Sequence, residues 1–121
     1  MGDLELMSFQ IISAVGTAKS CYVEAMRAAE QGDFEEAEAK IKEGETVFVT
    51  GHSAHASLIQ KEASGEGVTP NVLLMHAEDQ LMSAETIKLM AEEIIRLNRR
   101  LHALKKKKTK GEKNEKSLFI L

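Results

Sequence analysis

The sequence predicts an all-α fold in which three helices form an antiparallel bundle. Its composition is 43% apolar but only 4% aromatic, with no Trp and a single Pro, and this mix favours helices over strands. Three long stretches place apolar residues at spacings of three and four, the signature of amphipathic helices. Two short connections separate these stretches, so successive helices should run antiparallel, up, down and up.

The first helix is expected over residues 4–31 and the second from Asp33 to residue 60 or 63. Gly32 suits the end of a helix, and the carboxylate of Asp33 can cap the next one. Glu36, three positions later, completes a capping-box pattern.

Three glycines lie inside these two helices. Gly16 should lower the stability of the first helix by about 1 kcal/mol relative to Ala. A close approach between helices would explain a glycine at this position. Gly44 and Gly51 weaken the prediction of the second helix locally.

The second connection reads SGEGVTPN. Thr69 can cap the third helix, and Pro70 fits its first position, where a missing N–H costs nothing. We therefore expect the third helix over residues 70–104, before a run of lysines. The chain of 121 residues then divides into a three-helix domain, residues 1–104, and a basic, disordered tail, residues 105–121.

Charge and cysteine usage limit the function classes. Residues 1–104 carry nine basic and seventeen acidic side chains, and such an acidic body argues against binding nucleic acid. The single cysteine, Cys21, excludes an internal disulfide and fits a reducing compartment. The sequence has neither an apolar run of roughly 18–20 residues nor a secretion signal, so we expect a cytoplasmic protein.

The third helix carries two apolar sides. A narrow seam, of the kind that one helix uses against a partner helix, consists of Leu73, His76, Gln80, Ser83, Ile87, Met90, Ile94, Leu97 and Leu101. A second side, available for packing inside the bundle, consists of Leu74, Ala77, Leu81, Ala84 and Ile95. Three helices have too few internal faces to bury both sides, so a homo-oligomer is expected.

A polar cluster interrupts this seam. Helical spacing places His76, Asp79, Gln80 and Ser83 on one face, while Glu78 points elsewhere. One interpretation is an exposed stretch, or a histidine that sets the register. A second is a ring of Asp79 carboxylates, contributed by several chains, around a hard cation such as Mg²⁺. A third is that His76 acts as a nucleophile, because neutral imidazole has a ring nitrogen that can take and pass on a phosphoryl group.

Other chemistries fit poorly. One His and one Asp are too few ligands for a closed zinc site in a monomer. Cys21 and Ser83 lack a base and an oxyanion site, and Cys21 is better explained as a small core residue. His52 and His55 have no Glu or Cys to complete a metal set, and the repeated Glu-x-x-His of di-iron bundles is missing.

Four segments carry a resemblance to a known family. They are GTAKS (16–20), EAMRAAEQGDFEEAEAKIKE (24–43), QKEASGEG (60–67) and above all VLLMHAEDQLM (72–82). In this order they resemble the enzyme IIA component of the phosphoenolpyruvate-dependent sugar phosphotransferase system (PTS), lactose/cellobiose (N,N'-diacetylchitobiose) type. The match covers about residues 8–104.

The resemblance implies a homotrimer of three-helix subunits. His76 matches the histidine that receives phosphate from HPr and donates it to the cysteine of a IIB component, itself linked to the membrane component IIC. Asp79 matches the aspartate that gathers around Mg²⁺ or another divalent cation inside the trimer. The implied function is a phosphocarrier for uptake of a β-linked disaccharide of the lactose/cellobiose/chitobiose class.

The chain departs from the family pattern at four positions, one of which is Gly51, where Ala is usual before His52. Glu78 stands where Gln is usual, Gln80 where His is usual, and His55 where Gln is common. Gln80 can donate a hydrogen bond to a phosphoryl group but carries no positive charge. These departures leave open a second hypothesis, a non-catalytic trimeric helical scaffold or regulator that retains the fold.

Overall fold

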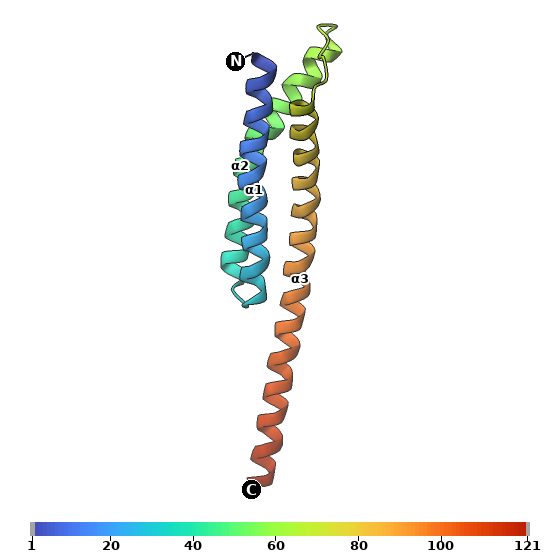
Figure 1. Ribbon diagram of the computed structural model, residues 1–121. Helices are drawn as coiled ribbons and strands as arrows, with labels where there is room; N and C mark the ends of the chain where they lie inside the picture. Colours follow the sequence, from blue (N-terminus) through green and yellow to red (C-terminus); the bar gives the residue numbers. More distant parts are fainter. Residues whose placement is uncertain (1, 121) are drawn as a thin grey trace.

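The computed structural model consists of three long helices, as the sequence predicted (Figure 1). They are α1 (Asp3–Glu30), α2 (Phe34–Ala63) and α3 (Val72–Ile120). The structure describes the backbone of residues 2–120 and the side chains of residues 2–113. α2 runs antiparallel to α1 and α3, and α1 packs along both, whereas α2 and α3 contact each other much less. The prediction of an all-α antiparallel three-helix bundle is confirmed.

The connection between α1 and α2 forms as the sequence predicted, with one difference. Gly32 has a φ of +82°, a conformation open to glycine because it lacks a Cβ. Asp33 Oδ1 accepts a hydrogen bond from the Glu36 backbone N–H at 3.1 Å, which caps α2. The Asp33 backbone N–H donates to the carbonyl of Ala28 at 2.9 Å and so closes α1. The expected capping box also needs a hydrogen bond from this N–H to the side chain of Glu36. That bond does not form, because the Asp33 N–H already donates to Ala28.

The start of α3 differs from the prediction. Asn71, not Thr69, caps the helix, because Asn71 Oδ1 accepts a hydrogen bond from the Leu74 N–H at 2.8 Å. α3 begins at Val72, which leaves Pro70 outside the helix. Asn is a stronger N-cap residue than Thr, and Asn71 lies directly before the first helical residue.

The far end of α3 also differs. The helix does not end at Leu104 but continues to Ile120, beyond the ends of α1 and α2 (Figure 1). Residues 105–120 therefore have regular helical structure where the sequence predicted a disordered tail. Lysine is a good helix former, no Pro interrupts the segment, and extending an existing helix avoids the cost of nucleation.

Two glycines of α2 allow α1 to approach closely. A Cβ at Gly44 would lie 2.4 Å from Cε1 of Tyr22, and one at Gly51 would lie 3.1 Å from Cγ1 of Val15. Tyr22 and Val15 are among the most deeply buried side chains of the bundle. Gly16, in contrast, is exposed, and a Cβ there would meet no atom within 4 Å, so the expected close approach at Gly16 is wrong.

One apolar side of α3 packs inside the bundle as predicted. Ala77, Leu81, Ala84 and Ile95 are all buried, and Leu74 is half-buried against the same core. The expected outward seam is only partly confirmed. Its members Met90, Leu97 and Leu101 are exposed. Its members Leu73, Ile87 and Ile94 are half-buried, so the exposed apolar side is rotated by part of a turn from the expected one. The large apolar side chains that α3 exposes, here called the outer row, are Val72, Met75, Met82, Leu89, Met90, Leu97, Leu101 and Leu104. Spacing alone gave the period of the pattern, but packing against α1 determines the rotation of the helix.

Over the described residues, none of the helices is both long and apolar enough to span a membrane.

Candidate functional site

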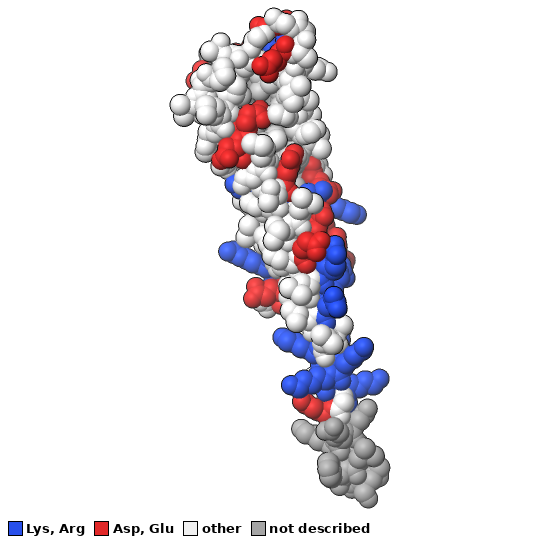
Figure 2. All heavy atoms as spheres, turned by 90° about the vertical axis from the view of Figure 1, so that its right-hand side faces the viewer, with Lys and Arg blue, Asp and Glu red and all other residues white. Residues whose placement is uncertain are grey.

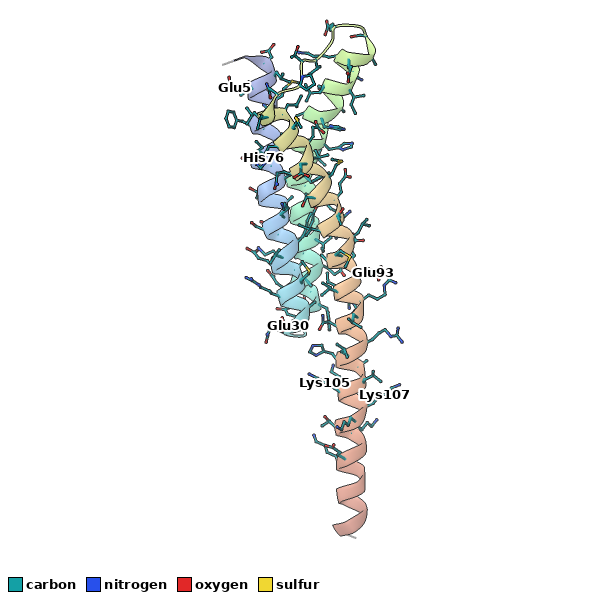
Figure 3. All side chains as sticks on the ribbon, turned by 45° about the vertical axis from the view of Figure 1, so that its right-hand side comes forward. Glu5, Glu30, His76, Glu93, Lys105 and Lys107 are labelled. Carbon is teal, nitrogen blue, oxygen red and sulfur yellow. The ribbon has the colours of Figure 1, made fainter. Side chains whose placement is uncertain are left out.

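His76 lies in the second turn of α3, and its side chain is exposed (Figure 3). The helix begins at the Asn71 cap and is already anchored by the buried side chain of Ala77. A rigid helix therefore presents the imidazole to solvent, where another protein can reach it. Gln80 is one turn further along the same face.

The amide of Gln80 contacts α1. Lys19 Nζ donates a hydrogen bond to Gln80 Oε1 over 2.7 Å, and both residues are half-buried. Ammonium groups only donate hydrogen bonds, so the amide oxygen must face Lys19, and the NH₂ group with its two donors points away. The contact of Lys19 with Gln80 was not predicted from the sequence. The only signal for Lys19 was the segment GTAKS, which contains it.

Glu78 lies on the opposite side of α3 from His76. Two residues advance a helix by roughly 200°, and this turn carries Glu78 toward α2. There Glu78 Oε2 lies 2.6 Å from Nδ1 of His55. The atoms are at ion-pair distance but lack the alignment of a hydrogen bond. His55 and Glu78, which both differ from the family pattern, thus contact each other.

Asp79 lies on a third side of α3. Its side chain is exposed, and its spacing of four from Met75 and three from Met82 places it within the outer row. Met75 and Met82 are 64% and 58% exposed. Within the part of one chain that the structure describes, no group of three or more His, Cys, Asp or Glu could hold a metal ion. A cation at Asp79 would need carboxylates from several chains.

The other residues considered from the sequence lie away from this site. Cys21 is buried, as expected of a small core residue, and burial raises the pKa of its thiol. The ring of His52 stacks on Phe48 with centroids 6.2 Å apart, and His52 and His55 are neighbours with centroids 6.5 Å apart. Ser83 is half-buried on α3.

The chain is similar to known proteins in both sequence and fold. The family model of the PTS lactose/cellobiose-specific IIA subunit matches residues 6–99. The oligo-β-mannoside-specific EIIA component of Bacillus subtilis (strain 168) is 41% identical over 93 residues, 77% of this chain and 84% of that protein. The lactose-specific EIIA component of Staphylococcus aureus (strain N315) is 35% identical over 98 residues, 81% of this chain and 95% of that protein.

A solved structure has the same fold. The crystal structure of the PTS cellobiose-specific enzyme IIA from Bacillus anthracis superposes with a TM-score of 0.82 and 39% identity. It covers 85% of this chain and 94% of its own. The three-helix fold and these similarities define a phosphotransferase component of a sugar transport system. Within that class, the chain belongs to the lactose/cellobiose-specific IIA family.

Proposed function

We propose that this chain is a phosphocarrier that accepts a phosphoryl group from phospho-HPr on His76 and passes it to the cysteine of a IIB component. The exposure of His76 on the rigid start of α3 is the observation that carries the proposal. Phosphoryl transfer between proteins needs an accessible nucleophile in a fixed position more than an elaborate set of catalytic groups. The transfer would take place in the cytoplasm and connect the chain, through the IIB component, with the membrane component IIC.

Each transfer is balanced in bonds and protons. A lone pair of the His76 imidazole forms a new N–P bond while the N–P bond of the donor phosphohistidine breaks. The electron pair of the broken bond stays on the donor ring, which takes up one proton as His76 gives up the proton of its other ring nitrogen. In the second transfer an S–P bond forms on the IIB cysteine, and the proton of its thiol replaces the one that His76 lost.

The names of the relatives support a proposal for the substrate class. Their names specify lactose, cellobiose and oligo-β-mannosides. We therefore propose that the phosphate serves the uptake of a β-linked disaccharide of the lactose/cellobiose/chitobiose class.

The outer row of α3 supports assembly into a homotrimer. Eight large apolar side chains lie exposed on one helix, more than a monomer in water ordinarily leaves uncovered. At Leu89 the row meets a groove of about 480 Å³ between α2 and α3, whose apolar lining includes Phe48 and Val49. A second and third copy of the chain would cover these surfaces.

In such a trimer the Asp79 carboxylates would face one another. Each chain offers one carboxylate, and three related by symmetry supply the oxygen ligands that Mg²⁺ or another divalent cation prefers. Without a metal the three charges repel, so Asp79→Leu should raise the temperature of thermal unfolding in the presence of a chelator. Analytical ultracentrifugation should give a trimer for both proteins. If neither the chelator nor the substitution changes the unfolding temperature, the axial cation site is wrong.

The function itself is tested with purified components. Incubation with phosphoenolpyruvate, enzyme I and HPr should add one phosphate per chain, and addition of a IIB component should then remove it. His76→Ala should take up none while keeping its helical circular dichroism. If the wild-type chain stays unlabelled while a control IIA protein is labelled, the phosphocarrier role is wrong and the scaffold or regulator hypothesis takes its place.

A further inference from the structure

We propose that Lys19 and Gln80 form a binding site for the oxygens of the phosphoryl group that His76 carries. The inference rests on the proposed function and assigns a role to a residue of α1. The Lys19–Gln80 hydrogen bond joins α1 to α3 one turn from His76.

The hydrogen bond fixes the orientation of both groups. Because Gln80 Oε1 accepts from Lys19 at 2.7 Å, the Gln80 NH₂ group keeps two donors directed away from Lys19. The ammonium group has three N–H donors, and this contact uses one of them. Gln80 therefore retains two donors on the face of α3 that it shares with His76, and Lys19 retains two donors beside it.

The charge of Lys19 is available to an anion. Lys40 contacts the carboxylates of Glu24 and Glu43, and Lys88 contacts those of Glu45 and Glu92. Lys19, in contrast, contacts a neutral amide and forms no ion pair with a carboxylate among the described residues. A half-buried cation without a counter-ion is suited to bind an incoming dianion, because partial burial strengthens its field.

The arrangement also compensates for the departure at position 80. Gln80 has no positive charge of its own, and the Lys19 ammonium 2.7 Å away supplies one at the same place. The negative charge of Glu78 lies against His55 on the opposite side of α3. The phosphoryl group on His76 would thus be held by one charged and one neutral donor, and hydrogen bonds that involve a charge are the stronger kind.

The test measures the equilibrium of phosphoryl exchange between phospho-HPr and this chain. Lys19→Met keeps the aliphatic stem but removes the charge, and Lys42→Met removes the same charge from an exposed position on α2. Loss of a charged hydrogen bond should lower the exchange constant of Lys19→Met by about 10- to 100-fold. Lys19→Arg should retain most of it, and Lys42→Met should match the wild type. The ³¹P resonance of the phosphorylated protein should shift in Lys19→Met alone.

A second variant separates binding of phosphate from support of the fold. In the Lys19→Met background, Gln80→His should restore part of the exchange constant, more at pH 6 than at pH 8, because imidazolium supplies the missing charge. A purely structural role for Lys19 would lower thermal stability without changing the exchange constant. If Lys19→Met and Lys42→Met exchange phosphate equally well, the binding site is wrong although the phosphocarrier role stands. If the wild-type chain takes up no phosphate, the phosphocarrier role itself is wrong.

Discussion

His55 Nδ1 lies 2.6 Å from Glu78 Oε2 and joins α2 to α3 on the side of α3 that faces away from His76. This contact explains Glu78 without any part in phosphoryl transfer. Each side chain is about one quarter exposed, so the pair should contribute little to stability, about 0.5–1 kcal/mol.

Glu78→Gln should therefore leave the rate of phosphate uptake from phospho-HPr within about twofold of wild type and lower the free energy of unfolding by under ~1 kcal/mol. The double variant Glu78→Gln/His55→Gln should have about the same free energy of unfolding as the less stable of the two single variants. The effects do not add, because the two residues contact each other. A large change in uptake rate for Glu78→Gln would mean that its charge reaches the phosphoryl site.

The packing of α1 on α2 gives a second prediction. Gly44→Ala would place a Cβ 2.4 Å from Tyr22 Cε1, in a core where Tyr22 is 1% exposed. Overpacking of this kind should lower the free energy of unfolding by about 2–3 kcal/mol. Urea unfolding at a fixed protein concentration measures it. Gly16→Ala is the matched control, because a Cβ there meets no atom within 4 Å and should stabilise the helix by about 0.5–1 kcal/mol. Equal effects of the two substitutions would contradict the packing described for α1 and α2.

The thiol of Cys21 gives a third prediction. Burial and, to a smaller extent, the charge of Glu43 raise its pKa above the ordinary value of 9.0. Only the thiolate reacts with disulfide reagents, so at pH 8 the native thiol should react at least about 100-fold more slowly than the urea-unfolded one. The contribution of the protonated thiol to stability is fully present below pH 9.0 and is lost as the pH rises through the raised pKa of the folded state. Equal reaction rates in buffer and in urea would show that Cys21 is not in the core.

The extension of α3 gives a fourth prediction. The side chains of residues 105–113 are exposed, and lysines gather on this part of the molecule (Figure 2). A chain that ends at Leu104 should therefore unfold with a free energy within about 0.5 kcal/mol of the full chain. Its far-UV circular dichroism should lose helical signal in proportion to the residues removed. An unchanged total helical signal would mean that the segment is not helical in solution.

Local chemistry predicted the elements of the fold well. The Asp33 cap, the Gly32 turn and the buried positions Ala77 and Leu81 depend on short-range rules that a sequence displays directly. The end of α3 could not be predicted in the same way, since a lysine run is compatible with both a helix and a disordered chain.

The site was only partly predictable. The sequence placed His76 and Gln80 on one face, but Lys19 is 61 positions from Gln80, and only the packing of α1 on α3 brings them together. The pairing of His55 with Glu78 likewise depends on tertiary structure. Gly44 and Gly51, which weaken a helix in isolation, proved to be positions where side chains of α1 pack closely against α2.

The central claim is that one particular imidazole carries the phosphoryl group. The chain contains four histidines, His52, His55, His76 and His102, so the phosphate can be assigned to one ring. Mass spectrometry of peptides from the protein labelled by phosphoenolpyruvate, enzyme I and HPr, kept at alkaline pH where phosphohistidine survives, should find the phosphate on His76 alone. Phosphate on another histidine, or none on His76 while a control IIA protein is labelled at its own site, would contradict the claim.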